Sequence, residues 1–232
     1  MTPSLLTYDL PLLDGLSPRD LTRLDIRSRV LNLTAWETLF QESDRVCDVY
    51  FLISGALMAI HWTEDGREII FTRFQIGDHF GELAAIDGGP RSLAIVAREE
   101  SQVLVLERSS FLRLIDAVPD IRNRLLLSLS DRIRQLTRRN LQFVTQTVEQ
   151  RVRSYLVSMA FDRGKLHPGA VLDDMPTHAE IAASIGANRE IVSRVLSQMR
   201  RSGVIETGRC RIRLLDPGSL ADPSVPAATG IS

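Results

Sequence analysis

The chain has 232 residues, of which 44% are hydrophobic and 25% charged, and its formal net charge is −1. This composition is that of an ordinary globular protein, and the length exceeds the usual single domain of about 100–150 residues. The apolar runs, such as 49–60, are interrupted and too short to span a bilayer, and no basic stretch followed by an apolar segment opens the chain. We therefore expect a cytoplasmic protein with two domains.

Residues that bind metals or catalyse reactions do not form recognisable groups. Cys47 and Cys210 are far apart, and neither has a CxxC partner or a neighbouring histidine. The four histidines lack the spacing of metal ligands. Paired metal carboxylates, a nucleophile beside a base and a Walker-type loop are also missing from the sequence. We therefore expect no metal, no bound cofactor and no enzymatic activity.

The charge is unevenly distributed along the chain. Residues 1–118 carry 11 Arg against 18 acidic residues, a balance of −7, whereas residues 119–232 carry 17 Arg and Lys against 11 acidic residues, a balance of +6. The basic half is the candidate for contact with nucleic acid. On charge alone, a merely solvated basic surface is an equal alternative.

The first half of the chain predicts one short helix and then many strands. Ser17-Pro18, an N-cap followed by proline, predicts a helix over 17–28. Strand-like runs follow at 30–33, 49–53, 56–62, 68–74, 92–97 and 102–107. Asp65-Gly66, between two of these runs, predicts a hairpin turn. Short strands at this spacing favour a β-barrel or jelly roll within an α+β fold.

One segment within this region, 80–97, places a carboxylate and a guanidinium around a Gly-rich turn. Gly81 and the later Gly-Gly pair let the backbone approach a ligand closely, and successive N–H groups there bind oxygen anions. Arg91 offers a two-pronged donor to a phosphate, and Ser92 offers a hydroxyl. Glu82 is suited to accept a hydrogen bond from a sugar hydroxyl. A simple ion pair between Glu82 and Arg91 is the alternative.

This segment resembles the phosphate-binding cassette of cyclic-nucleotide-binding domains, whose pattern is Phe-Gly-Glu-Leu-Ala, a short turn, then Pro-Arg-Ser/Thr-Ala. The matching residues are Phe80, Gly81, Glu82, Leu83, Ala84, Pro90, Arg91 and Ser92. Leu93 stands where the family usually has Ala, which leaves the identity of the nucleotide open. The resemblance implies a jelly roll with the cassette as its helical insertion, and a cyclic nucleotide as the effector.

After Pro119 the pattern predicts one long helix to about residue 147. Residues that are mostly apolar recur at alternating spacings of three and four, which is the pattern of a coiled-coil seam and predicts a homodimer. The seam consists of Leu126, Leu129, Ile133, Leu136, Asn140, Phe143 and Thr147. Leu125 and Leu127 lie off the seam, and we expect both in the core of their own domain. A core helix without a partner is the alternative for the seam itself.

A linker helix over 148–160 leads to a helix-turn-helix. Thr177 as N-cap, Glu180 three residues later and Gly186 at the end predict the first helix, and the second begins near Arg189. The residues expected to pack the two helices together are Ile181, Ala182, Ile185, Ile191 and Val195. The residues expected to face the major groove are Arg189, Glu190, Ser193 and Arg194.

Other polar and basic side chains of this region are expected at the DNA backbone. Thr177, His178 and Arg200 are assigned to phosphates. The segment 203–214 predicts a β-hairpin wing with its turn at 207–209, and Arg211 in it is assigned to the DNA backbone as well.

The order of these parts resembles the Crp–Fnr family of bacterial transcription regulators, with the cyclic AMP receptor protein branch as the nearest. The organisation is then a sensor domain over 1–118, a dimerisation helix over 119–147, a winged helix-turn-helix over 148–215 and a disordered tail over 216–232. The resemblance implies cyclic AMP or cyclic GMP as effector, a pseudopalindromic TGTGA-like operator and RNA polymerase as a partner. It also implies that Leu136-Thr137 meets the nucleotide base. A regulator independent of cyclic mononucleotides, or one that responds to cyclic di-GMP, is the alternative.

Overall fold

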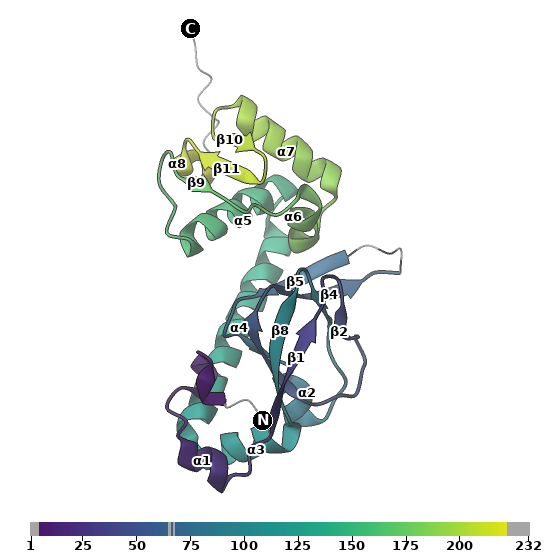
Figure 1. Cartoon of the computed structure of the whole chain (residues 1–232). Helices are drawn as coiled ribbons and strands as arrows, with labels where there is room; N and C mark the ends of the chain where they lie inside the picture. The colour runs from purple at the N-terminus through teal and green to yellow at the C-terminus, as the bar shows by residue number, and fades with distance from the viewer. Residues whose placement is uncertain (1–4, 65, 67, 222–232) are drawn as a thin grey trace. The chain divides into compact units, whose positions relative to one another are not determined.

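The computed structural model describes residues 5–64, 66 and 68–221 (Figure 1). The chain divides into two compact units, Met1–Arg134 and Gln135–Ser232, and the boundary falls within one long helix. Within the described residues, no helix combines the length and the apolar character needed to cross a membrane.

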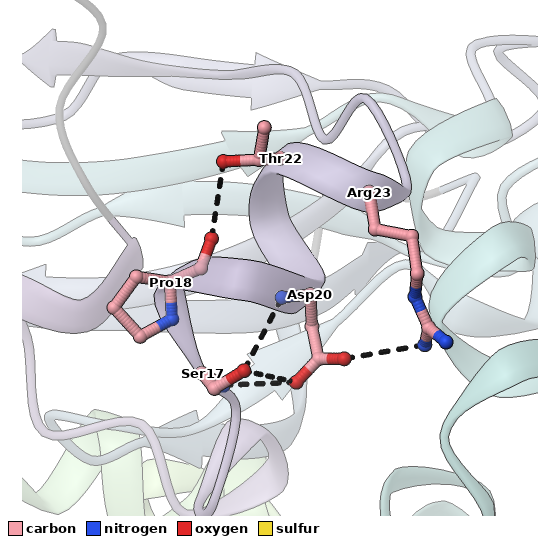
Figure 2. Close-up of polar contacts among 5 residues, drawn as sticks. All are labelled: Ser17, Pro18, Asp20, Thr22 and Arg23. Atoms are coloured by element: carbon pink, nitrogen blue, oxygen red, sulfur yellow. Dashed lines mark hydrogen bonds and ion pairs between the residues drawn. The ribbon is translucent and has the colours of Figure 1, made fainter.

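A capping box sets the start of the first α-helix, α1 (Pro18–Arg23). The Ser17 hydroxyl accepts a hydrogen bond from the Asp20 N–H, and the Asp20 carboxylate accepts one from the Ser17 N–H, both at 3.2 Å (Figure 2). These hydrogen bonds hold the pKa of the Asp20 carboxyl below its usual value. The predicted start is confirmed, but the helix ends at Arg23 rather than Ser28, and Asp25 just after it has a positive φ of 46° that a right-handed helix does not contain.

Two four-stranded antiparallel sheets form the body of the first unit, in the orders β1-β8-β3-β6 and β2-β7-β4-β5. The strands are β1 (Ser28–Leu33), β2 (Thr38–Phe40), β3 (Val49–Ser54), β4 (Leu57–Trp62), β5 (Glu68–Phe74), β6 (His79–Phe80), β7 (Ala94–Ala97) and β8 (Ser101–Leu106). Buried side chains from all eight strands share one core, so the jelly-roll prediction is confirmed. Strands β2 and β6 were not predicted because they have only three and two residues.

The predicted hairpin joins β4 and β5, which pair from Leu57 opposite Phe74 to Trp62 opposite Glu68. Gly66 in the connecting loop has a φ of 78°, a conformation that favours glycine. Asp65, the other residue of the predicted turn, lies outside the described residues.

A second core lies beneath the N-terminal segment, which the sequence did not predict as structured. Leucines of this segment, among them Leu5 and Leu12, pack with helix α3 (Arg108–Ala117) and with the start of helix α4 (Pro119–Thr145). Arg124 of α4 donates from Nε to the Leu12 carbonyl at 3.1 Å. The segment is thereby attached to the long helix by both apolar and polar contacts.

Helix α4 agrees with the predicted long helix, and most of its side chains are exposed. Leu125 is buried as expected, but Leu127 is 63% exposed, so that expectation was wrong. Two positions apart correspond to about 200° around a helix, so both leucines cannot face one core. Among the seam residues, Leu129 packs partly against the core of its own unit. Thr147 lies beyond the end of α4 and is the N-cap of the next helix.

The described part of the second unit contains a three-stranded antiparallel sheet in the order β10-β11-β9 and four helices after α4. Its elements are α5 (Val148–Asp162), β9 (Val171–Leu172), α6 (His178–Ile185), α7 (Arg189–Arg201), β10 (Ile205–Gly208), β11 (Arg211–Leu214) and α8 (Pro217–Ala221). One apolar cluster joins α5, α6, α7 and the sheet. The helix-turn-helix and the wing are thus built on a common core.

Two expectations for the C-terminal part need correction. Gly208 pairs with Arg211, so the wing turn consists of Arg209 and Cys210 rather than residues 207–209. The segment after Asp216 is not disordered throughout, because α8 forms there and buries Leu220 in the core. Residues 222–232, the rest of the expected tail, lie outside the described residues.

Candidate functional site

Close backbone approach defines the cassette. Helix α2 (Glu82–Asp87) begins after Gly81, whose φ is 85°, and ends at Gly88, whose φ is 72°. A Cβ atom on Gly81 would lie 2.5 Å from Nη1 of Arg91 and 2.9 Å from the carbonyl oxygen of Asp48. Glycine is therefore required here both for the backbone conformation and for the space that the guanidinium occupies.

Arg91 is held inside the cassette by backbone carbonyls. Its side chain is only 3% exposed. Nη1 donates to the Gly81 carbonyl at 2.9 Å, and Nη2 donates to the Asp48 carbonyl at 2.7 Å. The guanidinium also stacks over the Phe40 ring, 4.2 Å from its centroid. Its third nitrogen position, Nε, is buried and has no hydrogen-bond partner within the described part of the chain.

Glu82 is ion-paired, and its partner is Arg132 rather than Arg91. The Glu82 side chain is 2% exposed, and its Oε1 accepts from Nη1 of Arg132 at 2.6 Å. Nη2 of Arg132 donates to the His79 carbonyl at 2.5 Å. The second carboxylate oxygen, Oε2, is buried without a hydrogen-bond partner among the described residues. Glu82 thus joins the cassette to α4 through one oxygen only.

Arg132 could not be identified as a partner of Glu82 from the sequence. It lies 50 residues from Glu82, in a helix whose predicted role was the coiled-coil seam, and it is one of many arginines there. Only the packing of α4 against the sensor barrel makes it part of the cassette. The alternative of a Glu82–Arg91 ion pair was therefore wrong. Glu82 pairs with Arg132, and Arg91 donates to two backbone carbonyls.

His79, which precedes the cassette, is buried next to this ion pair. Burial, together with the positive charge of Arg132, lowers the pKa of the His79 imidazole to about 4. Its Nε2 lies 3.5 Å from the Ser128 hydroxyl of α4. The imidazole is neutral at physiological pH, so it adds no charge to the site.

The other residues assigned to the nucleotide differ in exposure. Ala84 is buried, whereas Leu83 and Ser92 are exposed. Leu136 and Thr137 belong to the second unit, so their contact with a base stays a prediction.

The helix-turn-helix has the predicted caps. Thr177 accepts from the Glu180 N–H at 3.2 Å, and the Glu180 carboxylate accepts from the Thr177 N–H at 2.9 Å. Gly186 ends α6 with a φ of 61°, and a Cβ there would lie 2.8 Å from the Phe143 ring. Arg151 donates to the Ile185 carbonyl at 2.7 Å. The turn between the helices is thereby held by the end of α4 and by α5.

The outward face of α7 has the polar composition that the sequence predicted. Arg189, Glu190 and Arg194 are exposed, and Ser193 is half-buried. The Ser193 hydroxyl lies 2.8 Å from Nδ1 of His178, the first residue of α6. This contact joins a residue assigned to the major groove with one assigned to a phosphate, which the sequence did not indicate.

The other residues assigned to the DNA backbone lie on the surface of the same unit. Thr177, Arg200 and Arg211 are exposed. Arg211 lies against Gly208 across the wing, where a Cβ would be 2.7 Å from its Nε. Within the described residues no cluster of His, Cys, Asp and Glu is suited to hold a metal ion.

Comparison with known proteins gives one family match in each half of the chain. Residues 30–118 match the family model of the cyclic nucleotide-binding domain, and residues 150–222 match that of the Crp-like helix-turn-helix domain. The CRP-like cAMP-activated global transcriptional regulator of Mycobacterium tuberculosis is 28% identical over 209 residues, 89% of this chain and 93% of the relative. The Cyclic AMP receptor protein of Thermus thermophilus is 29% identical over 200 residues, 85% of this chain and 89% of the relative.

The solved structures show the same fold. A variant of CooA from Carboxydothermus hydrogenoformans superposes with a TM-score of 0.74 at 21% identity, covering 90% of this chain and 91% of that chain. The protein is therefore a DNA-binding transcription regulator with a cyclic-nucleotide-binding domain. It belongs to the Crp–Fnr family.

Proposed function

We propose that this regulator responds to a cyclic mononucleotide, cyclic AMP or cyclic GMP, which binds the cassette and changes the affinity of the protein for a specific operator. One observation supports this most directly. Glu82 Oε2 and Arg91 Nε, one hydrogen-bond acceptor and one donor, are both buried and both without a partner within the described residues. A buried polar atom without a partner costs about 1–3 kcal/mol, so a ligand that pairs with both atoms is favoured.

The chemistry of these two atoms fits a ribose cyclic phosphate. A carboxylate oxygen accepts a hydrogen bond from a sugar hydroxyl, and a guanidinium N–H donates to a phosphoryl oxygen. Both groups occur on a cyclic mononucleotide, a short distance apart. Ser92, exposed beside Arg91, supplies a second donor for the phosphate. The relatives named as cAMP-activated regulators support the same class of ligand.

Arg132 supplies a route from ligand to helix. It holds Glu82 from α4, and α4 continues into the second unit. A ligand hydroxyl at Oε2 changes the charge distribution on the carboxylate that Arg132 binds. Such a ligand shifts the conformational equilibrium only if it binds the two states of the protein with different affinities.

We further propose that the active form is a homodimer formed through α4. Leu126, Ile133 and Leu136 of the predicted seam are each more than half exposed in the single chain. A parallel pairing of two such helices buries these side chains. A two-fold dimer binds a pseudopalindromic, TGTGA-like operator whose half-sites lie about 34 Å apart. In this scheme the protein acts in the cytoplasm, without enzymatic activity, and RNA polymerase is its partner at promoters.

Within the operator, Arg189, Glu190 and Arg194 read bases, since Arg donates to guanine and Glu accepts from cytosine. Thr177, Arg200 and Arg211 bind phosphates and fix the register of the protein on DNA. The exposed positions of all six side chains support this division.

Calorimetric titration tests the sensor part of the proposal. Purified protein is titrated with cyclic AMP, cyclic GMP and cyclic di-GMP, and each titration is repeated on Arg91→Ala and on Arg23→Ala. Arg23 is a matched control, because it is an exposed arginine of the same unit that pairs with Asp20 at the surface. We expect saturable binding of a cyclic mononucleotide that Arg91→Ala abolishes and Arg23→Ala preserves.

Two other outcomes would contradict the proposal. Binding of cyclic di-GMP alone would identify a different effector. Binding of none of the three by a folded protein would identify a regulator that works without a cyclic nucleotide. Circular dichroism of Arg91→Ala is required beside the titration, because this side chain also makes two hydrogen bonds within the fold.

A further inference from the structure

The contact between His178 and Ser193 connects the two helices of the helix-turn-helix at their exposed side. His178 is the first residue of α6, and Ser193 lies in the second turn of α7. Their side chains are joined by a hydrogen bond of 2.8 Å between Nδ1 and the hydroxyl oxygen. His178 is exposed and Ser193 is half-buried, so the pair lies at the edge of the surface proposed to meet DNA.

The position of the pair is fixed on both sides. The capping box between Thr177 and Glu180 sets the first turn of α6 and with it the backbone of His178. The apolar contacts between α6 and α7, which include Ile181 and Val195, set the distance between the helices. The imidazole and the hydroxyl are thus placed by contacts that do not depend on DNA.

Ser193 lies beside the residues proposed to read bases. It follows Arg189 by four positions and Glu190 by three, and residues at these spacings are neighbours on one face of a helix. The hydroxyl of Ser193 is therefore within the set of side chains that α7 presents to the major groove. One part of its hydrogen-bonding capacity is already used by His178.

The direction of this hydrogen bond decides what Ser193 offers to a base. A serine hydroxyl has one donor and two acceptor sites, and the two imidazole nitrogens differ in which one carries the proton. If Nδ1 of His178 accepts, Ser193 has only lone pairs left and favours adenine N6 or cytosine N4. If Nδ1 donates, the Ser193 hydroxyl is free to donate to thymine O4 or to guanine.

We propose that His178 is a specificity-determining residue that acts through Ser193, by fixing the direction of the Ser193 hydroxyl at the DNA surface. This inference rests on the proposed function, in which α7 reads the bases of the operator. It assigns His178 a positioning role in place of the phosphate contact expected from the sequence. Base preference at one base pair of each half-site then depends on a side chain that does not itself touch that base.

Selection from randomised DNA tests the inference. Wild-type protein and the variants His178→Ala, Ser193→Ala and their double mutant are each allowed to bind a pool of randomised duplexes of about 30 base pairs, with cyclic AMP or cyclic GMP present. The bound fraction is sequenced to give base preferences at every position. His167→Ala serves as the matched control, because the His167 side chain contacts the adjacent Pro168 carbonyl in a loop outside the helix-turn-helix.

We expect His178→Ala and Ser193→Ala to weaken discrimination at the same base pair by about 3- to 10-fold, the effect of one hydrogen bond. The double mutant should show no further loss, since both changes remove one interaction. His167→Ala should leave all preferences unchanged. Folding of each variant is checked by thermal melting, and we expect small shifts because His178 is exposed and Ser193 is only half-buried.

Two results would overturn the inference. One is a uniform loss of affinity for all sequences in His178→Ala, which would indicate a phosphate contact. The other is a loss of discrimination in Ser193→Ala that His178→Ala does not share. Arg189→Ala distinguishes failure of the His178 proposal from failure of the proposed function. Unchanged base preferences in Arg189→Ala would mean that α7 does not read the operator at all.

Discussion

In the sensor unit the two side chains proposed to meet the ligand, Glu82 and Arg91, are 2% and 3% exposed, whereas in the DNA-binding unit Arg189, Glu190 and Arg194 lie on the surface. A buried charge is costly unless its hydrogen bonds are made, so the cassette is organised by internal partners and depends on them for stability. Exposed charges cost little and gain affinity when they replace the counterions of DNA. Mutations in the sensor unit should therefore affect folding and ligand binding together, and those in the reading helix should affect DNA binding alone.

We expect the sensor unit to lose stability in acid. An unfolded chain protonates histidine near pH 6.5, but buried His79 is protonated only near pH 4. The contribution of neutral His79 to the free energy of unfolding is therefore fully present above about pH 6.5. It falls by up to about 3 kcal/mol as the pH decreases to 4. Urea unfolding at several pH values, followed by tryptophan fluorescence, measures this, because Trp36 and Trp62 both belong to the sensor unit.

His79→Phe should remove most of this pH dependence, since the ring is retained and the titrating group is lost. An unchanged pH dependence in that variant would show that other groups cause the acid effect. His167→Ala, in the second unit, should leave the tryptophan transition as it is in the wild type.

A second test concerns the ion pair between Glu82 and Arg132. Arg132→Ala leaves a buried carboxylate without its cation, and we expect a loss of about 2–3 kcal/mol. The value is below that of a fully buried pair because 36% of the Arg132 side chain is exposed. Urea unfolding of the sensor unit provides the measurement. Adding Glu82→Gln should restore part of the loss, because the uncompensated charge is then gone.

Arg134→Ala is the matched control for this test. Arg134 pairs with Asp131 on the same helix, but both side chains are more than 60% exposed. Such a pair contributes at most about 0.5 kcal/mol to the free energy of unfolding. Equal losses for Arg132→Ala and Arg134→Ala would contradict the importance of burial at the cassette.

These contacts also show the limit of sequence interpretation. The cassette and its glycines were predicted because the local order of residues fixes a turn and a short helix. The partner of Glu82 was not predicted, since Arg132 reaches it only through tertiary packing of α4. The buried N-terminal leucines were missed because their apolar spacing matches neither a helix nor a strand. Their burial, too, depends on tertiary packing.

In the DNA-binding unit the local signals were stronger. Thr177, Glu180 and Gly186 determine their own helix ends, and the structure agrees with each. The wing turn was predicted at 207–209 but lies at 209–210, since a hairpin register depends on pairing between strands rather than on the turn sequence alone.

For DNA binding, Arg189→Ala should cost about 2 kcal/mol on a specific operator and relax the preference at one base pair. Arg211→Ala should weaken binding to specific and random duplexes equally, because a phosphate contact carries no sequence information. Fluorescence anisotropy with both kinds of duplex measures the difference. Equal losses on both duplexes for Arg189→Ala would remove it from the reading set.

The smallest expected effect concerns the turn of the helix-turn-helix. Gly186 and Gly203 both have positive φ, of 61° and 72°, so either Gly→Ala change introduces backbone strain. Only at Gly186 does the new Cβ also meet a side chain, the Phe143 ring. We expect Gly186→Ala to cost about 1 kcal/mol more than Gly203→Ala in thermal unfolding, because the new Cβ crowds the ring. The extra cost is limited to this size because the half-exposed ring can move aside. Adding Phe143→Ala should cancel the difference, and its persistence would exclude the ring as the cause.

The central claim is that occupancy of the buried cassette controls DNA binding by the exposed helix. The most direct measurement is the affinity for a duplex with two inverted TGTGA half-sites about one helical turn apart, with and without cyclic AMP or cyclic GMP, for wild type and Arg91→Ala. The account predicts at least about a tenfold gain in affinity with one nucleotide in the wild type, a coupling of about 1.4 kcal/mol, and no gain in Arg91→Ala. Equal affinity of the wild type with and without either nucleotide would contradict it.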